Sequence, residues 1–167
     1  MIYSFRNSAF RDPETGVYNQ IYFLEVFHRE WHRHLREQEQ LTLVFLRPHL
    51  HETYRHQGLM ESLTADIQAC LLRATDIIAR LESDLFAIGL FNISDHGTAT
   101  VVERVEQCMD QFVQNYERDH SFSLGYKIAA VGCNPTRNKS LETLFERVHQ
   151  LSGELEHNAN QHLISKF

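Results

Sequence analysis

Apolar residues recur every three or four positions in four stretches of this chain, a spacing that places them on one face of a helix. In the first stretch, from Asn19 to about Gln38, the stripe consists of Ile21, Leu24, Phe27, Trp31 and Leu35. Three more helices are predicted around residues 63–74, 101–112 and 141–151. Because each apolar stripe must be covered, the pattern predicts helices that pack on a common surface.

Shorter apolar runs lie between the expected helices and predict five strands. They cover residues 41–46, 77–81, 85–91, 126–133 and 162–165. The second and third runs flank a polar trio, a pattern typical of a β-hairpin with a tight turn at Glu82 and Ser83. Both arms of this hairpin are apolar at consecutive positions, so we expect it at the centre of the sheet. The pattern therefore predicts an α+β fold of the split-βαβ type, in which helices cover a mixed sheet.

Composition and charge narrow the class of protein. The chain has 167 residues, of which 43% are hydrophobic, so it is long enough for one domain with a core and too short for two. A formal net charge of -6 argues against binding to nucleic acid, which needs a cationic surface. The sequence shows neither an apolar run of about 18 residues nor the features of a secretory signal. We therefore expect a cytoplasmic protein that does not insert into a membrane.

Cysteines and histidines are the residues to consider first for metal or redox chemistry. The three cysteines, Cys70, Cys108 and Cys133, are scattered through apolar segments, which indicates reduced core thiols. Among eleven histidines, His28 and His32 are helical neighbours without the acid spacing of a zinc helix. A second group is interpreted as a solvated loop: His49, His51, Glu52 and His56. The sequence therefore predicts no metal site.

Several segments resemble one known family. Residues 12–19, Asp-Pro-Glu-Thr-Gly-Val-Tyr-Asn, with Tyr-Phe-Leu at 22–24, are similar to the D-x-L-T-G-L-x-N-R-R-x-F opening of GGDEF domains, the diguanylate cyclase family. Residues 76–87 fall where that family has D-x-x-x-R-x-G-G-D/E-E-F, and residues 102–104 match its A-E-R helix. The resemblance implies a fold like the palm of nucleotide cyclases, with a central five-stranded sheet, mixed or antiparallel, wrapped by helices. It also implies a bacterial signalling protein with a lead-in at 1–11 and a single degenerate GGDEF domain at 12–167.

The resemblance implies that the catalytic chemistry of the family is lost. Family members condense two GTP molecules into cyclic di-GMP with divalent metals that carboxylates hold. The place of the first metal carboxylate is taken by Arg47, and a cation cannot hold Mg²⁺. The signature turn reads Glu82, Ser83, Asp84, Leu85 and Phe86. It keeps one acid, and it replaces both glycines where phosphates approach, so we expect no catalytic residues, no bound metal and no cofactor.

A second site of the family is retained. Arg73 and Asp76 form its R-x-x-D inhibitory motif at the family's spacing before the signature turn, and Arg104 takes the place of the arginine on the A-E-R helix. The resemblance implies that these residues bind cyclic di-GMP, since arginines reach guanine or phosphate oxygens and a carboxylate accepts from ring N–H groups. The alternative is an ordinary ion pair between Arg73 and Asp76, worth about 0.5 kcal/mol. Asp84 is expected only to cap or solvate its turn.

These observations predict a catalytically inactive signalling domain that acts as a cyclic di-GMP receptor or regulatory module. A protein partner or a homodimer is expected, and no nucleic acid. One alternative is a ligand-independent interaction or dimerisation module, and another is GTP binding without turnover. The loss of the metal carboxylates argues against a further alternative, an active diguanylate cyclase.

Overall fold

The computed structural model describes residues 9–49, 58–119 and 124–167. The strands are β1 (Tyr18–Asn19), β2 (Leu41–His49), β3 (Ile77–Glu82), β4 (Leu85–Phe91), β5 (Gly125–Cys133) and β6 (His162–Lys166). The helices are α2 (Gln20–Glu37), α3 (Leu59–Cys70), α4 (Asp95–Asp119) and α5 (Leu141–Glu156). All four predicted helices and all five predicted strands are therefore present.

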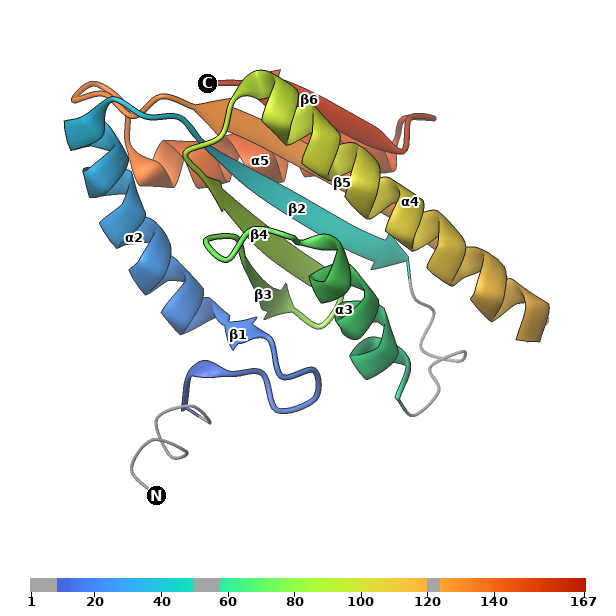
Figure 1. Ribbon diagram of the computed structural model, residues 1–167. Coiled ribbons are helices and arrows are strands. Elements are labelled where there is room, and N and C mark those ends of the chain that lie inside the picture. The colour runs from blue at the N-terminus through green and yellow to red at the C-terminus, as the bar shows by residue number, and fades with distance from the viewer. Residues whose placement is uncertain (1–8, 50–57, 120–123) are drawn as a thin grey trace.

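The strands form one mixed sheet in the order β1-β3-β4-β2-β5-β6 (Figure 1). The inner pairs are antiparallel, whereas β1 and β6 join the two edges in parallel. One apolar cluster joins α3 and α4 to one face of the sheet, and a second joins α2 and α5 to the other. The α+β prediction is confirmed, but the sheet has six strands, because two residues before α2 pair with β3, too short a segment to produce a hydrophobic period.

The hairpin lies where the sequence predicts it, with one correction to its turn. Strand β4 is buried at every residue and lies between β3 and β2. Strand β3 has only the two residues of β1 outside it. The turn is formed by Ser83 and Asp84, because Glu82 still pairs with Leu85 in the ladder. The turn predicted at Glu82 and Ser83 is thus one residue too early.

Helix α2 presents a different apolar face from the predicted one. Its buried residues are Phe23, Phe27, Trp31 and His34. Ile21 is 72% exposed and Leu24 is 37% exposed, so the predicted stripe is wrong at these two positions. Phe23 and Leu24 are adjacent and both apolar, and the larger ring takes the place over the sheet because it fills more of the core. The N-terminus of α2 is fixed by Asn19, whose side chain accepts a hydrogen bond from the Tyr22 N–H at 3.0 Å.

Aromatic rings fill the space between α2 and the sheet. The Phe27 ring lies 5.4 Å from that of Phe91 and 5.7 Å from that of Phe145, measured between centroids. Gly89 of β4 makes this approach feasible, because a Cβ there would lie 2.9 Å from a Phe91 ring carbon. The face of the sheet under α2 is therefore closely packed around Gly89.

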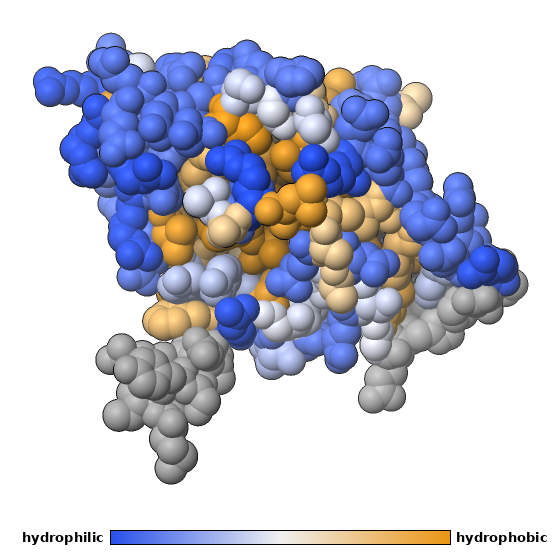
Figure 2. Space-filling model, in the orientation of Figure 1, coloured by the Kyte–Doolittle hydropathy of each residue, from blue (hydrophilic) through white to orange (hydrophobic). Residues whose placement is uncertain are grey.

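The surface is mainly polar. Figure 2 shows hydrophilic residues around the rim of the molecule and hydrophobic residues gathered in the middle of one face. Within the described ranges, none of the helices combines the length and the apolar character needed to cross a membrane.

Phe27 tests the assignment of the buried face of α2. We expect Phe27→Ala to reduce the free energy of unfolding by about 3–5 kcal/mol, since it removes a fully buried ring from between two others. Ile21→Ala on the same helix is the control and changes stability by less than about 0.5 kcal/mol. Urea unfolding measures both. Equal losses for the two variants would contradict the packing of α2 described above.

Candidate functional site

An arginine lies where β2 approaches the signature turn. The Arg47 Nη1 is 3.3 Å from the Asp84 Oδ1 and 3.7 Å from the Glu82 Oε2. The side chain of Arg47 is 22% exposed, so the ion pairs are partly shielded from water. Its guanidinium therefore neutralises the carboxylates of the turn from within the protein.

The residues around this turn do not fit a divalent metal. Asp84 is already paired with Arg47, and Leu85 is fully buried in the apolar cluster under α2 and α5, where it offers no oxygen. Phe86 is buried on the opposite face of the sheet. Over residues 9–49, 58–119 and 124–167, no group of three or more His, Cys, Asp or Glu side chains has the arrangement to hold a metal ion. Mg²⁺ needs several oxygen ligands, and the two carboxylates at this turn, Glu82 and Asp84, are paired with Arg47 instead.

Arg80 holds the same turn from the other side. Its Nε and Nη2 donate to the Ser83 carbonyl oxygen at 3.1 and 2.7 Å. Its Nη1 donates to Asp12 Oδ2 at 3.1 Å and to Glu14 Oε1 at 2.5 Å. Burial acts to raise the pKa of Asp12, but hydrogen bonds from Thr15 and Arg80 outweigh it and lower that pKa. The sequence did not indicate this network, because its members are joined only when β1 pairs with β3.

The three residues of the predicted ligand site lie together at the opposite end of the hairpin. Arg73 follows α3, and its Nη2 donates to the carbonyl oxygens of Phe91 at 2.5 Å and Asn92 at 3.2 Å. Its Nε is 3.9 Å from the Asp76 Oδ1. Arg104, half-buried on α4, is near enough for its charge to act on Asp76. The charges of two cations from different elements thus act on this carboxylate.

Asp76 is the unusual member of this group. Its side chain is only 1% exposed, and its Oδ1 accepts no hydrogen bond. Burial raises the pKa of Asp76, and the charges of Arg73 and Arg104, with a hydrogen bond from the Arg73 backbone N–H, oppose this rise without cancelling it. A buried acceptor without a donor costs free energy, so the site has an unmet need for hydrogen-bond donors. This differs from the ordinary surface ion pair that the sequence left open.

A small cavity adjoins Asp76. Its volume is about 240 Å³, and its lining consists of Arg11, Tyr18, Gln68, Leu71, Asp76, Ile77 and Ile78. The Arg11 guanidinium lies 4.7 Å from the centroid of the Tyr18 ring. Sequence reasoning missed the residues from β1 and α3, because only the folded sheet brings them beside the R-x-x-D motif.

The histidines that the structure describes belong to no group that could hold a metal ion. His28 and His32 are exposed and stack edge to face, with ring centroids 4.7 Å apart. The His49 Nε2 is 2.8 Å from Glu156 Oε2 on α5. His51, Glu52 and His56, which complete the second predicted group, lie outside the described residues.

The cysteines are only partly as predicted. Cys133 is a buried core thiol, as expected. Cys70 and Cys108 are only half-buried, so the interpretation of them as core thiols is wrong. Cys70 lies on α3 and Cys108 on α4, and the two residues are neighbours where these helices pack together.

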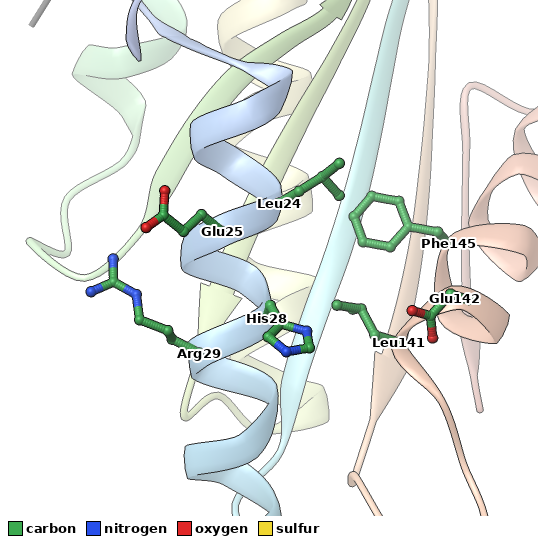
Figure 3. A pocket seen from close by; sticks show the side chains of 7 residues that line it. All are labelled: Leu24, Glu25, His28, Arg29, Leu141, Glu142 and Phe145. Carbon is green, nitrogen blue, oxygen red and sulfur yellow. The ribbon is translucent and has the colours of Figure 1, made fainter. Parts of the chain in front are cut away.

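An apolar groove runs between α2 and α5, with a volume of about 680 Å³ (Figure 3). Its apolar residues are Leu24, Leu141 and Phe145. Charged and polar residues border it: Glu25, His28, Arg29 and Glu142. Leu24 lines this groove and is therefore exposed, which the predicted helix stripe did not indicate.

Comparison with known proteins identifies relatives of this chain. A family model described as "Diguanylate cyclase, GGDEF domain" matches residues 9–162. No curated protein matches the sequence.

Three solved structures illustrate the likeness in fold. The GGDEF domain of FimX from Pseudomonas aeruginosa is 15% identical, with a TM-score of 0.73 over 93% of this chain and 98% of that one. DgcB from Caulobacter crescentus, a coiled coil and GGDEF domain in complex with c-di-GMP, is 13% identical, with a TM-score of 0.80 over 99% and 90%. Diguanylate cyclase SiaD from Pseudomonas aeruginosa, in complex with its activator SiaC, is 15% identical, with a TM-score of 0.79 over 99% and 65%. At these identities the likeness shows the fold alone.

The raised pKa of Asp76 predicts how its charge affects stability. The folded protein retains the carboxyl proton at pH values where the unfolded chain has lost it, so stability is highest below the ordinary pKa of an aspartate and falls as the pH rises through the raised pKa. Asp76→Asn removes the ionised form. We expect it to increase the free energy of unfolding at neutral pH by on the order of 1 kcal/mol, a gain that disappears near about pH 3.

Urea unfolding at the two pH values measures this gain. The control is Asp84→Asn, since Asp84 is 42% exposed and its loss changes stability by less than about 0.5 kcal/mol. A loss of stability in Asp76→Asn at neutral pH would mean that the arginines already satisfy the carboxylate as an ordinary ion pair.

Proposed function

Because the chain belongs to the GGDEF domain family of diguanylate cyclases, we propose that it is a catalytically inactive member that acts as a receptor for cyclic di-GMP. The site is formed by Arg73, Asp76 and Arg104. The observation that carries this proposal is the buried Asp76 Oδ1, which accepts no hydrogen bond although the charges of two arginines act on its carboxylate.

Cyclic di-GMP supplies the groups that this site lacks. Guanine carries N–H donors on the edge that a carboxylate recognises, which answers the free acceptor of Asp76. Its O6 and N7 atoms and the two phosphates accept hydrogen bonds from arginine forks. DgcB, a structural neighbour, is described in complex with c-di-GMP, which supports this choice of ligand.

The present contacts of Arg73 set a condition for binding. Its Nη2 donates to the carbonyl oxygens of Phe91 and Asn92, so these bonds hold the side chain beside the site. A ligand oxygen must either replace these carbonyls or use the remaining N–H groups of the guanidinium. Because charge-assisted bonds to phosphate are stronger than bonds to a neutral carbonyl, the exchange favours an anionic ligand.

The proposed lack of catalysis rests on the other end of the hairpin. Condensation of GTP in this family needs metal-held phosphates, and here Arg47 pairs with the carboxylates while Leu85 lies in the core. The anionic Glu82 also repels a triphosphate in the position where the family has a glycine.

A protein-interaction module is the second candidate function, and the apolar groove between α2 and α5 favours it. Leu24 and Phe145 line the groove in Figure 3. The neighbour SiaD is described in complex with an activator protein, which shows that a domain of this fold occurs in protein complexes. If no small ligand binds, the protein-interaction module takes the place of the receptor as the proposed function.

The receptor proposal predicts which residues control affinity. We expect Arg73→Ala to weaken binding of cyclic di-GMP roughly tenfold to hundredfold, because it removes a charge-assisted contact worth about 1.5–3 kcal/mol. Arg104→Ala weakens binding in the same direction. Asp84→Ala at the other end of the hairpin is the matched control and leaves the Kd unchanged.

Calorimetry on the folded variants measures these values, and circular dichroism verifies that each variant folds. GTP with Mg²⁺ is titrated in parallel. If the wild-type protein produces no heat with cyclic di-GMP at high micromolar concentration, the receptor proposal is wrong. Heat with GTP alone would instead support GTP binding without turnover.

The lost metal site gives a separate prediction. Wild-type protein incubated with GTP and Mg²⁺ or Mn²⁺ yields no cyclic di-GMP, and Mn²⁺ does not raise its thermal midpoint. Arg47→Asp places a third carboxylate beside Glu82 and Asp84, so we expect millimolar Mn²⁺ to stabilise this variant by a few degrees. Arg47→Ala is the control and does not respond. Product formation by the wild-type protein would contradict the proposed inactivity.

A further inference from the structure

Two cysteines from different helices meet beside the proposed ligand site. Cys70 is the last residue of α3, and Cys108 lies on α4. The Cys108 thiol donates to the Asp66 carbonyl oxygen at 3.1 Å. Asp66 precedes Cys70 by one helical turn, and helical side chains lean towards that turn, so the position of Cys108 matches the direction in which Cys70 projects. The Asp66 contact thus brings the Cys108 sulfur to the turn of α3 that carries Cys70, and Cys70 is near enough to act on the pKa of Cys108.

The pair is accessible to a small oxidant. Both residues are half-buried, whereas Cys133 is buried in β5. Burial and the neighbouring Cys70 thiol raise the pKa of Cys108 to about 12, which makes Cys108 a poor nucleophile. Cys70 is therefore the thiol that we expect to meet the oxidant first, and Cys108 is the one that resolves.

The cysteines join the two segments that carry the arginines of the proposed site. Arg73 is three residues beyond Cys70, and Arg104 is one helical turn before Cys108. Helices α3 and α4 contact each other directly. A covalent bond between the thiols would thus fix the separation of the segment after α3 from α4.

We propose that Cys70 and Cys108 form a redox-active dithiol that a peroxide converts into a disulfide, and that this disulfide weakens the binding of cyclic di-GMP at the adjacent site. The second part rests on the function proposed above. It follows because Arg73 must leave the carbonyls of Phe91 and Asn92 to meet a ligand, and the disulfide restricts the segment that carries it.

The chemistry balances with hydrogen peroxide as the oxidant. The Cys70 sulfur attacks one peroxide oxygen, the O–O bond breaks, and the departing hydroxide takes up the thiol proton as water. The Cys108 sulfur then attacks the resulting sulfenic sulfur, the S–S bond forms, and a second hydroxide leaves with the Cys108 proton as water. Two thiols lose two electrons in total, and peroxide gains them.

Peptide mapping of the intact protein tests the disulfide without reference to any ligand. After treatment with hydrogen peroxide, we expect mass spectrometry to find Cys70 linked to Cys108 and Cys133 free, with the link reversed by a dithiol reductant. The thermal midpoint rises by roughly 5–10 °C on oxidation, because the link closes a long loop. Cys70→Ser and Cys108→Ser abolish both effects, and Cys133→Ser retains them. Oxidation of either thiol to sulfinic acid without a link overturns the proposal.

Calorimetry of the reduced and oxidised forms tests the effect on the ligand site. We expect the oxidised protein to bind cyclic di-GMP at least about fivefold more weakly, and peroxide-treated Cys108→Ser to bind like the reduced protein. Equal Kd values for a disulfide-linked and a reduced wild-type protein overturn the regulatory part. Absence of binding in both forms refutes the receptor function instead. Peptide mapping then still tests whether Cys70 and Cys108 form a disulfide.

Discussion

The antiparallel pairing of β2 with β4 determines where the two candidate sites of this protein lie. Its register joins Leu41 to Phe91 and Leu46 to Phe86, so the two strands run side by side over nearly the full length of the hairpin arm. One end of this pair places Arg47 beside the signature turn. The other end exposes the carbonyl oxygens of Phe91 and Asn92 to Arg73. The two candidate sites are thus separated by the length of a buried strand, and one can change without altering the other.

Three arginines contact this hairpin, and two of them perform the same physical task. Arg47 and Arg80 neutralise carboxylates around the turn, and their bonds leave those charges satisfied. Arg73 differs, because its strong bonds go to backbone carbonyls and its nearest carboxylate is 3.9 Å away. A satisfied ion-pair network stabilises a turn, whereas an incompletely satisfied one is typical of a binding site. Because of this contrast, we assign a structural role to the turn and propose a ligand-binding role for the R-x-x-D motif.

Much of the fold followed from hydrophobic periodicity, and the departures have physical reasons. The helices and the hairpin were predictable because each repeats its pattern over several turns or along a whole strand. Strand β1 was not, because two residues show no period. The face of α2 was misplaced because Phe23 and Leu24 both satisfy an apolar stripe, and only packing against Phe91 and Phe145 decides between neighbouring phases of the helix. For the site, family motifs located Arg73, Asp76 and Arg104, whereas the contact of Cys70 with Cys108 depends on how α3 packs on α4.

The ion pairs of Arg47 also bear on the history of this domain. Replacing the arginine by the acid of an active relative would bring a third negative charge beside Glu82 and Asp84 while Leu85 still fills the core. Such a variant, without a metal, suffers repulsion among its carboxylates. Assembly of a complete metal site at this turn therefore requires several substitutions at once, each unfavourable alone. The guanidinium thus makes the gain of a metal site by any single substitution unfavourable.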